Sequence, residues 1–313
     1  MRKIKKIILE NNNFLVLSHK NVEADALGSS LAFYYLLRKM NKKAWILNED
    51  TIPSSYNFLP GIKKISKNIS KIDAPICFVL DCSDVDRLGK TKRFLKGRKV
   101  VNIDHHISNT RFGDVNWVDS ESSSTCEMVY RLYRYLNVKL DKKIALCLYS
   151  GIVADTGSFS FGNTTSSTHK VIAELLKFNL PVNEIYQHIY HSFSFKEVLF
   201  SIRALSNIKL LKNGKIVYCI VDKTKPYKKD GSDTTEFMFS IMRAIKSVEV
   251  AILFKVLDSD KVHVSFRSKR NIDVNKIASL FGGGGHLRAS AVMMNMNINK
   301  AKNKVLKAVK RCF

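Results

Sequence analysis

The tripeptide Asp104-His105-His106 is the part of this sequence whose residue types most clearly predict chemistry. It directly follows the apolar run from Lys99 to Ile103, which has the composition of a buried strand. A carboxylate and two imidazoles at the end of a strand can ligate a metal ion or transfer protons. We therefore expect a reactive site at this strand end.

Other acids and histidines also stand at the ends of predicted strands or helices, namely His19, Glu23, Asp25, Asp81 and Asp155. Helix capping can explain a single acid at such a position, but it needs only one residue per helix and does not call for adjacent histidines. Oxygen and imidazole ligands together suit Mn²⁺, Mg²⁺ or Zn²⁺. The ligands suffice for two ions, which can clamp the attacking and leaving oxygens of a phosphate ester. The pattern favours phosphoester hydrolysis.

Apolar runs alternate with helical periodicity up to about residue 160, an order that predicts a parallel sheet of the α/β class. The predicted elements are strands 14–19, 43–48, 74–81 and 99–104, and helices 25–40, 122–137, 141–154, 166–179 and 182–190. The ligand-bearing loops then fall at the carboxyl ends of the strands, where such sheets place their sites.

A smaller α+β domain is predicted beyond this sheet. Its predicted elements are a hairpin over 208–222 with a primed turn at Asn213-Gly214, helix 233–246, strands 248–257 and 261–267, helix 273–280, strand 289–295 and helix 298–311. We assign residues 1–190 to a catalytic domain, 191–207 to a helical connector and 208–313 to the second domain. We expect the active-site cleft to lie between the two domains.

These residues belong to a series of motifs in a fixed order along nearly the whole chain. The motifs are His19 to Ser29, Val79 to Asp84 with Arg87 to Gly89, Ile103 to His106 with Asn109, Gly151 to Phe159, Val264 to Lys269 and Phe281 to His286. In this respect the chain resembles the DHH phosphoesterase family, specifically the short bacterial members that join a DHH domain to a DHH-associated C-terminal domain. Val22 stands where the family has proline, and Glu23 where it has aspartate.

The resemblance implies a role for each predicted site residue. One metal ion would be held by His19, Glu23 and Asp81, and a second by Asp25, Asp81, His105 and Asp155. Asp104 would orient His105, and His106 and Asn109 would face the scissile phosphate, so Asp104 and His106 are the predicted catalytic residues. In the second domain, substrate binding is predicted for Arg267, Ser268, Gly283, Gly284, Gly285 and His286.

The glycine-rich loop supports a binding role because backbone N–H groups without side chains can approach a phosphate closely. A tight turn or hinge is the alternative explanation for these glycines. Arg267 and His286 have the chemistry to contact a phosphate or to stack on a base.

The resemblance implies hydrolysis of very short oligoribonucleotides of two to four nucleotides, including linear di-adenylate (pApA), with two divalent ions, most readily Mn²⁺, and with Mg²⁺ or another ion as the alternative. A phosphatase acting on 3′-phosphoadenosine 5′-phosphate and a cyclic di-adenylate phosphodiesterase are alternative activities. A nucleotide-binding protein with degraded chemistry is the non-enzymatic alternative, motivated by Val22 and Glu23.

The composition of the chain limits the partners and the cellular location that we expect. The net charge of +25 comes mainly from lysines scattered along the chain, which favour encounters with anionic substrates. Six cysteines without paired spacing predict reduced thiols and a cytoplasmic location. No segment approaches the roughly 20 apolar residues of a membrane span. We therefore expect a short RNA or a small adenine nucleotide as the partner, with no membrane and no stable long DNA partner; a homodimer is left open.

Overall fold

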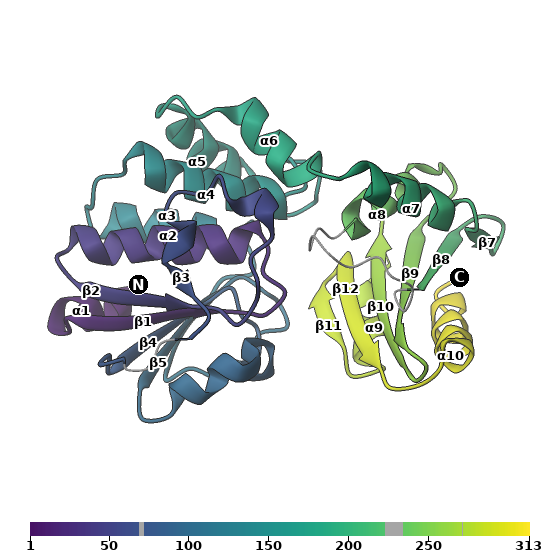
Figure 1. Cartoon of the computed structure of the whole chain (residues 1–313), viewed down its shortest axis with the longest axis horizontal. Helices are drawn as coiled ribbons and strands as arrows, with labels where there is room; N and C mark the ends of the chain where they lie inside the picture. Colours follow the sequence, from purple (N-terminus) through teal and green to yellow (C-terminus); the bar gives the residue numbers. More distant parts are fainter. Residues whose placement is uncertain (69–71, 223–233, 271) are drawn as a thin grey trace. The chain divides into compact units, whose positions relative to one another are not determined.

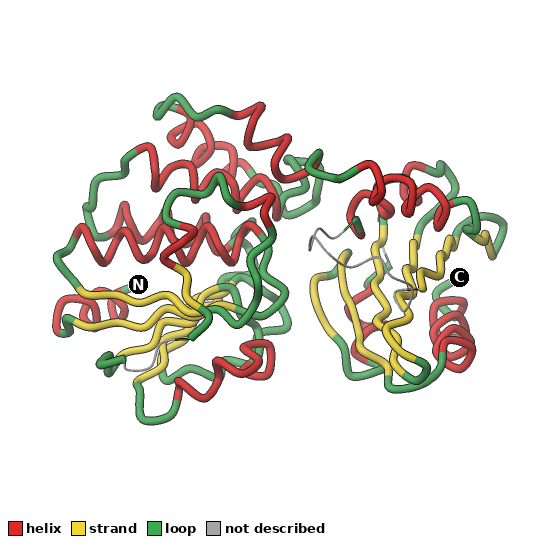
Figure 2. The backbone as a smooth tube through the Cα atoms, viewed as in Figure 1, coloured by secondary structure: helices red, strands yellow, loops and turns green. Residues whose placement is uncertain are grey.

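The computed structural model describes residues 1–68, 72–222, 234–270 and 272–313. It divides into two compact units, Met1–Ser192 and Phe193–Phe313. The helices and strands of each unit are drawn in Figure 1 and are coloured by type in Figure 2. No helix in these described ranges combines the length and the apolar character needed to cross a membrane.

The N-terminal unit is built on a parallel six-stranded sheet in the order β3-β2-β1-β4-β5-β6. The strands are β1 (Asn13–Ser18), β2 (Lys43–Leu47), β3 (Ile65–Ser66), β4 (Ile76–Leu80), β5 (Lys99–Asp104) and β6 (Val115–Val118). Every residue of β4 is buried, as are nearly all residues of β1 and β5. Such continuous burial is typical of parallel strands covered on both faces. The predicted α/β class is confirmed.

Helices cover both faces of this sheet (Figure 1). They are α1 (Arg2–Glu10), α2 (Ala24–Lys39), α3 (Thr125–Tyr135), α4 (Lys142–Asp155), α5 (Ser166–Leu176) and α6 (Val182–Tyr190), with the 3₁₀ segments η1 (Ser54–Tyr56), η2 (Ile62–Lys64) and η3 (Val85–Leu95). The larger apolar core joins α1 to α6 to one face, and the smaller one lies on the other face beside η3. Of these elements, α1, β6 and η3 were not expected from the sequence.

The C-terminal unit contains a mixed six-stranded sheet in the order β11-β12-β10-β9-β8-β7. Its strands are β7 (Lys209–Leu211), β8 (Ile216–Asp222), β9 (Val250–Asp258), β10 (Lys261–Ser268), β11 (Gly284–His286) and β12 (Ala289–Met294), and its helices are α7 (Phe195–Leu205), α8 (Thr235–Ala244), α9 (Val274–Ser279) and α10 (Ile298–Lys310). Residue 233, where a helix was predicted to begin, lies outside the described residues.

The hairpin β7–β8 has the predicted primed turn. Asn213 and Gly214 have φ angles of 54° and 80°, and Lys215 N–H donates to the carbonyl of Lys212. Positive φ at both central residues defines a type I′ turn, which Asn-Gly favours.

The segment expected to connect the domains is not a separate linker. Helix α7 packs through Phe200, Ala204 and Leu205 on the apolar cluster formed by β8, β9 and α8. It therefore belongs to the C-terminal unit.

Candidate active site

The predicted ligands gather at the carboxyl ends of neighbouring strands. The chain continues from β1 into His19, from β4 into Asp81 and from β5 into His105 and His106. The strand order turns back at β1, since β2 and β4 flank it on opposite sides. Open α/β sheets bind their ligands in the crevice beyond the carboxyl ends at such a switch point.

His19 and Asp81 face each other across this crevice. The Nδ1 atom of His19 lies 2.7 Å from the carbonyl oxygen of Lys20, and its Nε2 atom lies 3.3 Å from Oδ2 of Asp81. Asn48, which follows β2, donates to the backbone carbonyl of His19 at 2.9 Å. These contacts fix the ring orientation, with Nε2 directed at the carboxylate.

Asp25 is held by the start of α3. Its two carboxylate oxygens accept hydrogen bonds from the backbone N–H groups of Thr125 at 2.7 Å and Cys126 at 2.9 Å. The first N–H groups of a helix have no partner within it, and a carboxylate there also interacts favourably with the helix dipole. The hydroxyl of Thr125 donates to Asp81 Oδ1 at 3.2 Å, so one helix end positions both acids.

Two glycines allow α2 and α4 to cross close to this site. A Cβ atom on Gly28 would lie 2.4 Å from the carbonyl oxygen of Cys147, and one on Gly151 would lie 2.3 Å from Cys126 Sγ and 3.0 Å from the Cα of Asp25. No side chain fits at either position without movement. The glycines thereby bring Asp25, in the first turn of α2, close to the end of α4, where Asp155 stands.

His105 lies among three carboxylates. Its Nε2 atom is 3.3 Å from Asp155 Oδ2, 3.7 Å from Asp81 Oδ1 and 4.0 Å from Asp25 Oδ2. The Nδ1 atom of the ring lies 3.3 Å from the carbonyl oxygen of Ser122. The structure thus brings together the four residues predicted to share one ion. Asp81 lies next to His105 of this set and also next to His19 of the other predicted set.

Asp104 has a different partner from the one predicted. Its Oδ1 atom lies 2.7 Å from His106 Nδ1, whereas His105 uses the Ser122 carbonyl. The expectation that Asp104 orients His105 is therefore wrong. Successive side chains at a strand end point in different directions, so Asp104 and His106 share a side.

Asn109 supports Asp104. Its amide nitrogen donates to Asp104 Oδ2 at 2.6 Å and to Asn102 Oδ1 at 2.8 Å, and its amide oxygen accepts from the backbone N–H of Arg111. Both ends of the amide thus have partners within the protein, and the contact with the scissile phosphate stays a prediction.

The carboxylates of Asp25, Asp81 and Asp155 lie close enough for their negative charges to repel one another. Burial and the neighbouring Asp81 raise the pKa of Asp25 to about 8, and burial with the charges of Asp81 and Glu23 raises the pKa of Asp155 well above its usual range. Despite its own burial, Asp81 has a lowered pKa because His19, His106 and His105 surround it. A cation would remove this conflict.

The donor set fits divalent metal ions. Asp25, Asp81 and His105 each offer a ligand atom within 4.8 Å of the others, and Asp81, Asp104 and His106 form a second such group. Oδ2 of Asp155 is buried and accepts no hydrogen bond from the described residues. A buried carboxylate oxygen in that state matches a metal ligand better than a structural acid.

Glu23 differs from the other predicted ligands because it is exposed, whereas His19, Asp25, Asp81 and His105 are buried. It occupies the N-cap position of α2, immediately before the buried Ala24. The loop before it is fixed by Asp50, which accepts hydrogen bonds from the backbone N–H groups of Asn21 and Val22. Thus Val22, the other departure from the family motif, lies in a supported loop.

Sequence reasoning missed the side chains that brace the site from a distance. Asn163 donates to the carbonyls of Asp155 and Ser123, and the buried Glu127 accepts from the hydroxyls of Ser123 and Thr168. These contacts hold the backbone beside His105 and Asp155. The partners of Asn163 are 8 and 40 residues away along the chain, a spacing that corresponds to no recognisable motif.

In the C-terminal unit, two predicted substrate-binding residues have partners within the protein. Arg267 pairs with Glu236 of α8 and lies over the ring of Phe239, with its guanidinium carbon 4.9 Å from the ring centroid. The hydroxyl of Ser268 donates to the carbonyl of Ile272 at 2.7 Å. Ser268 therefore has a structural partner, and Arg267 would have to share its charge between Glu236 and a substrate; the substrate contacts of both residues stay predictions.

Packing within the C-terminal unit also requires glycine at two positions of the glycine-rich loop. A Cβ atom on Gly283 would lie 2.3 Å from the carbonyl of Ala291, and one on Gly285, whose φ is 145°, would lie 2.5 Å from the carbonyl of Ala289. Gly284, Gly285 and His286 form β11, which pairs with β12. Close pairing of β11 with β12 thus accounts for part of the glycine content.

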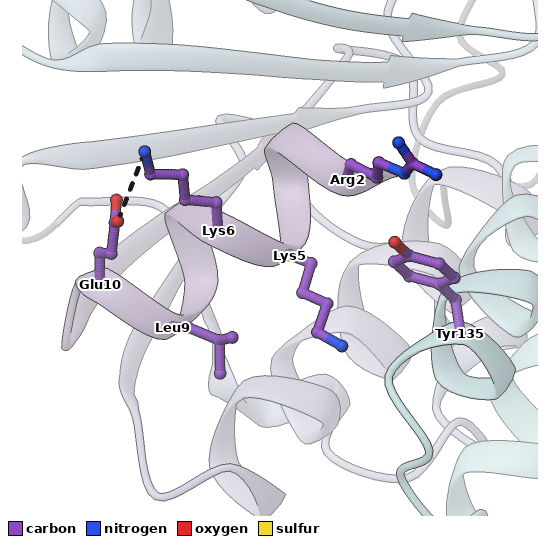
Figure 3. Close-up of a pocket in the computed structure, with 6 residues that line it drawn as sticks. All are labelled: Arg2, Lys5, Lys6, Leu9, Glu10 and Tyr135. Carbon is purple, nitrogen blue, oxygen red and sulfur yellow. Dashed lines mark ion pairs between the residues drawn. The ribbon is translucent and has the colours of Figure 1, made fainter.

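A pocket of about 380 Å³ lies elsewhere in the N-terminal unit (Figure 3). Residues of α1 and Tyr135 line it, and Lys5 Nζ lies 5.5 Å from the centre of the Tyr135 ring. Tyr135 ends α3, whereas the start of α3 holds Asp25. Ten residues of helix span roughly 15 Å, so this pocket is separate from the carboxylate cluster.

Comparison with known proteins gives two domain matches. Residues 13–152 match the DHH family, N-terminal domain, and residues 213–313 match the DHHA1 domain. These ranges contain the strand ends of the carboxylate cluster and the glycine loop, respectively.

The chain is also similar over most of its length to individual proteins. It is 29% identical over 281 residues to the bifunctional oligoribonuclease and PAP phosphatase NrnA of Bacillus subtilis, covering 88% of each chain. It is 29% identical over 299 residues to the Thermus thermophilus protein of the same name, covering 94% of this chain and 88% of that protein. An exopolyphosphatase-related protein from Bacteroides fragilis shares the fold, with a TM-score of 0.87, 24% identity, and coverage of 99% of this chain and 95% of that one.

Proposed function

Because the chain belongs to the DHH family of metal-dependent phosphoesterases and carries a DHHA1 domain, we propose that it hydrolyses very short oligoribonucleotides, including pApA, to mononucleotides. The proposal is supported above all by the ligand atoms of Asp25, Asp81 and His105, which lie within 4.8 Å of one another at the carboxyl ends of the strands. Acids and imidazoles gathered in this way suit phosphoester hydrolysis.

The same site is proposed to hold two divalent ions. His19, Glu23 and Asp81 would bind one, and Asp25, Asp81, His105 and Asp155 the other. Mixed oxygen and imidazole ligands suit Mn²⁺, Mg²⁺ or Zn²⁺, and the resemblance to the family favours Mn²⁺ among them. Ions at such a centre supply positive charge at the reacting phosphoryl group and make water more acidic.

Asp104 and His106 are proposed to act directly beside the substrate. The 2.7 Å contact with Asp104 directs Nδ1 of His106 at the carboxylate, and Nε2 is the atom proposed to meet a phosphoryl oxygen or a proton. Burial opposes ionisation of Asp104, but the charge and hydrogen bond of His106 hold the pKa of this carboxyl below its usual range. A fixed imidazole of this kind is suited to proton transfer.

A phosphatase activity on 3′-phosphoadenosine 5′-phosphate is the second proposed function. It is supported by the two NrnA relatives, whose names combine both activities. The two substrates are related, since each presents an adenosine with a phosphate on its 3′ oxygen. One metal centre can serve both reactions.

The test is to supply the Mn²⁺-loaded protein with pApA, RNAs of three to twenty nucleotides, 3′-phosphoadenosine 5′-phosphate and cyclic di-adenylate, and to compare kcat/KM, which measures discrimination. We expect the highest values for RNAs of two to four nucleotides and measurable release of phosphate from 3′-phosphoadenosine 5′-phosphate. Preference for the longest RNA or for cyclic di-adenylate would contradict the proposal.

Glu23→Asp is expected to retain or raise Mn²⁺-dependent activity. Aspartate restores the ligand that the family has at this position, and it is also a preferred N-cap residue, so α2 should be stabilised by about 0.5 to 1 kcal/mol. Metal affinity and kcat are the quantities to measure, with Glu23→Ala as the matched variant that removes the carboxylate. Loss of metal from Glu23→Asp would mean that the surrounding loop requires the longer side chain.

The C-terminal unit is proposed to bind the part of the substrate that does not react, with His286, Arg267 and the backbone of Gly283, Gly284 and Gly285 as contacts. Replacing His286 by alanine should raise KM for pApA by roughly tenfold to a hundredfold, the effect of losing one charged hydrogen bond. Hydrolysis of bis-p-nitrophenyl phosphate, which lacks the second nucleoside, should stay unchanged. His263→Ala, in β10 of the same unit, is the control.

An equal loss on both substrates from His286→Ala would contradict this binding role. It would show that His286 acts in the reaction itself or supports the fold. Some decrease of kcat for pApA alone is compatible with the proposal, because remote contacts also help to position the substrate.

A further inference from the structure

Arg87 lies beside the carboxylate cluster, in the η3 segment that follows β4. Its Nη1 atom is 3.4 Å from Nε2 of His106 and 3.2 Å from the hydroxyl of Ser83. His106 presents its other ring nitrogen, Nδ1, to Asp104, so the guanidinium group lies beside Nε2, the ring atom proposed to meet the substrate.

Hydrogen bonds hold the backbone of Arg87 against the loops that follow β1 and β4. The carbonyl of Arg87 accepts a hydrogen bond of 2.8 Å from the N–H of Lys20, the residue after His19. Asp84 caps η3 by accepting from the N–H of Asp86 at 2.8 Å. The guanidinium group is therefore supported by the same two loops that carry His19 and Asp81.

No carboxylate of the described residues lies within ion-pair distance of the Arg87 guanidinium group. Across the described ranges its side chain contacts Ser83 Oγ and His106 Nε2 only, both through Nη1, and it forms no ion pair. Other half-buried arginines differ: Arg131 pairs with Asp119, Arg267 pairs with Glu236, and Arg98 donates from Nε, Nη1 and Nη2 to three backbone carbonyls. A partly buried guanidinium group with Nε and Nη2 still available to donate is suited to a phosphate, which it can bind through two parallel hydrogen bonds.

From this arrangement we propose that Arg87 binds a non-bridging oxygen of the substrate phosphoryl group, next to His106. The proposal rests on the proposed phosphoesterase function and identifies the anion contact within the N-terminal unit.

The test compares Arg87→Gln and Arg87→Lys with Arg93→Gln in the full-length, Mn²⁺-loaded protein. Arg93 is the matched control because it lies in the same η3 segment, is exposed and hydrogen-bonds Asn68 at 3.2 Å. The measured quantities are the dissociation constant of inorganic phosphate by calorimetry, the Mn²⁺ content, the Tm, and kcat/KM for pApA.

For Arg87→Gln we expect phosphate binding and kcat/KM to fall by roughly tenfold to a hundredfold, as for the loss of a charged hydrogen bond, with unchanged Mn²⁺ content and Tm. Arg87→Lys should recover part of the phosphate affinity, because it keeps the charge but loses the paired donors. Arg93→Gln should behave as wild type.

Unchanged phosphate affinity in both Arg87 variants would overturn the inference, and so would loss of Mn²⁺, which would make Arg87 a support for the metal ligands. The phosphate measurement is independent of turnover. If the wild-type protein cleaves none of the RNAs, the proposed function fails, whereas weaker phosphate binding in Arg87→Gln alone would still support this role of Arg87.

Discussion

Replacement of Asp81 by alanine is expected to lower kcat/KM for pApA by about 10³-fold or more, since several kcal/mol of charge stabilisation depend on the metal centre. Asp81 is the one carboxylate that borders both predicted ligand sets, 3.3 Å from His19 Nε2 on one side and 3.7 Å from His105 Nε2 on the other. Its removal should release both ions. Turnover and Mn²⁺ content by elemental analysis measure the effect.

Asp81→Asn is the variant that separates the lost charge from a disturbed backbone. Asp81 has a φ of 55°, a left-handed conformation that asparagine tolerates and alanine does not. We expect Asp81→Asn to keep the wild-type Tm in the metal-free protein and still to lose both ions. Wild-type Mn²⁺ content, or turnover within tenfold of wild type, would contradict the shared role of Asp81.

The second large effect is expected for Gly151→Ala. The added methyl group would meet Cys126 Sγ at 2.3 Å, Asp25 Oδ1 at 2.8 Å and the Asp25 Cα atom at 3.0 Å. Overpacking of this kind costs about 1 to 3 kcal/mol, which should lower the Tm of a domain of this size by roughly 2 to 12 °C. Because Asp25 itself is displaced, kcat should fall by about 10²-fold, the scale expected for a misplacement near 1 Å.

Ser150→Ala is the control for this change. Ser150 is the buried neighbour of Gly151 in α4, and its hydroxyl donates only to Leu146 of the same helix among the described residues. Thermal unfolding and Mn²⁺ titration of both variants separate a general packing defect from displacement of Asp25. Wild-type Tm and metal affinity in Gly151→Ala would show that α2 and α4 can move apart at no cost, and that the glycine contact does not position the ligands.

Strands β1, β2, β4 and β5 of the N-terminal unit could be predicted because they are mostly apolar and alternate with segments of helical periodicity or loops. The same pattern placed His19, Asp81 and His105 correctly, since residues that end parallel strands must meet at one edge. Strand β6 escaped prediction because its four residues include Asn116 and all are half-buried, so it has neither an apolar run nor a clear alternation.

The partners of individual side chains could not be predicted in the same way. Asp104, His105 and His106 are consecutive, and only their directions in space decide that Asp104 meets His106 while His105 meets the Ser122 carbonyl. Likewise, the pairing of Arg267 with Glu236 joins residues 31 positions apart on β10 and α8. Composition and spacing identify which residues can react, whereas their contacts follow from packing.

The most direct test of the two-metal centre is anomalous X-ray scattering from crystals of the protein grown with Mn²⁺ and measured at the manganese absorption edge. The proposal predicts two anomalous peaks, both within bonding distance of Asp81, one beside His19 and the other beside His105. A single peak, or peaks away from Asp81, would contradict the assignment of Asp81 as the ligand that both ions share.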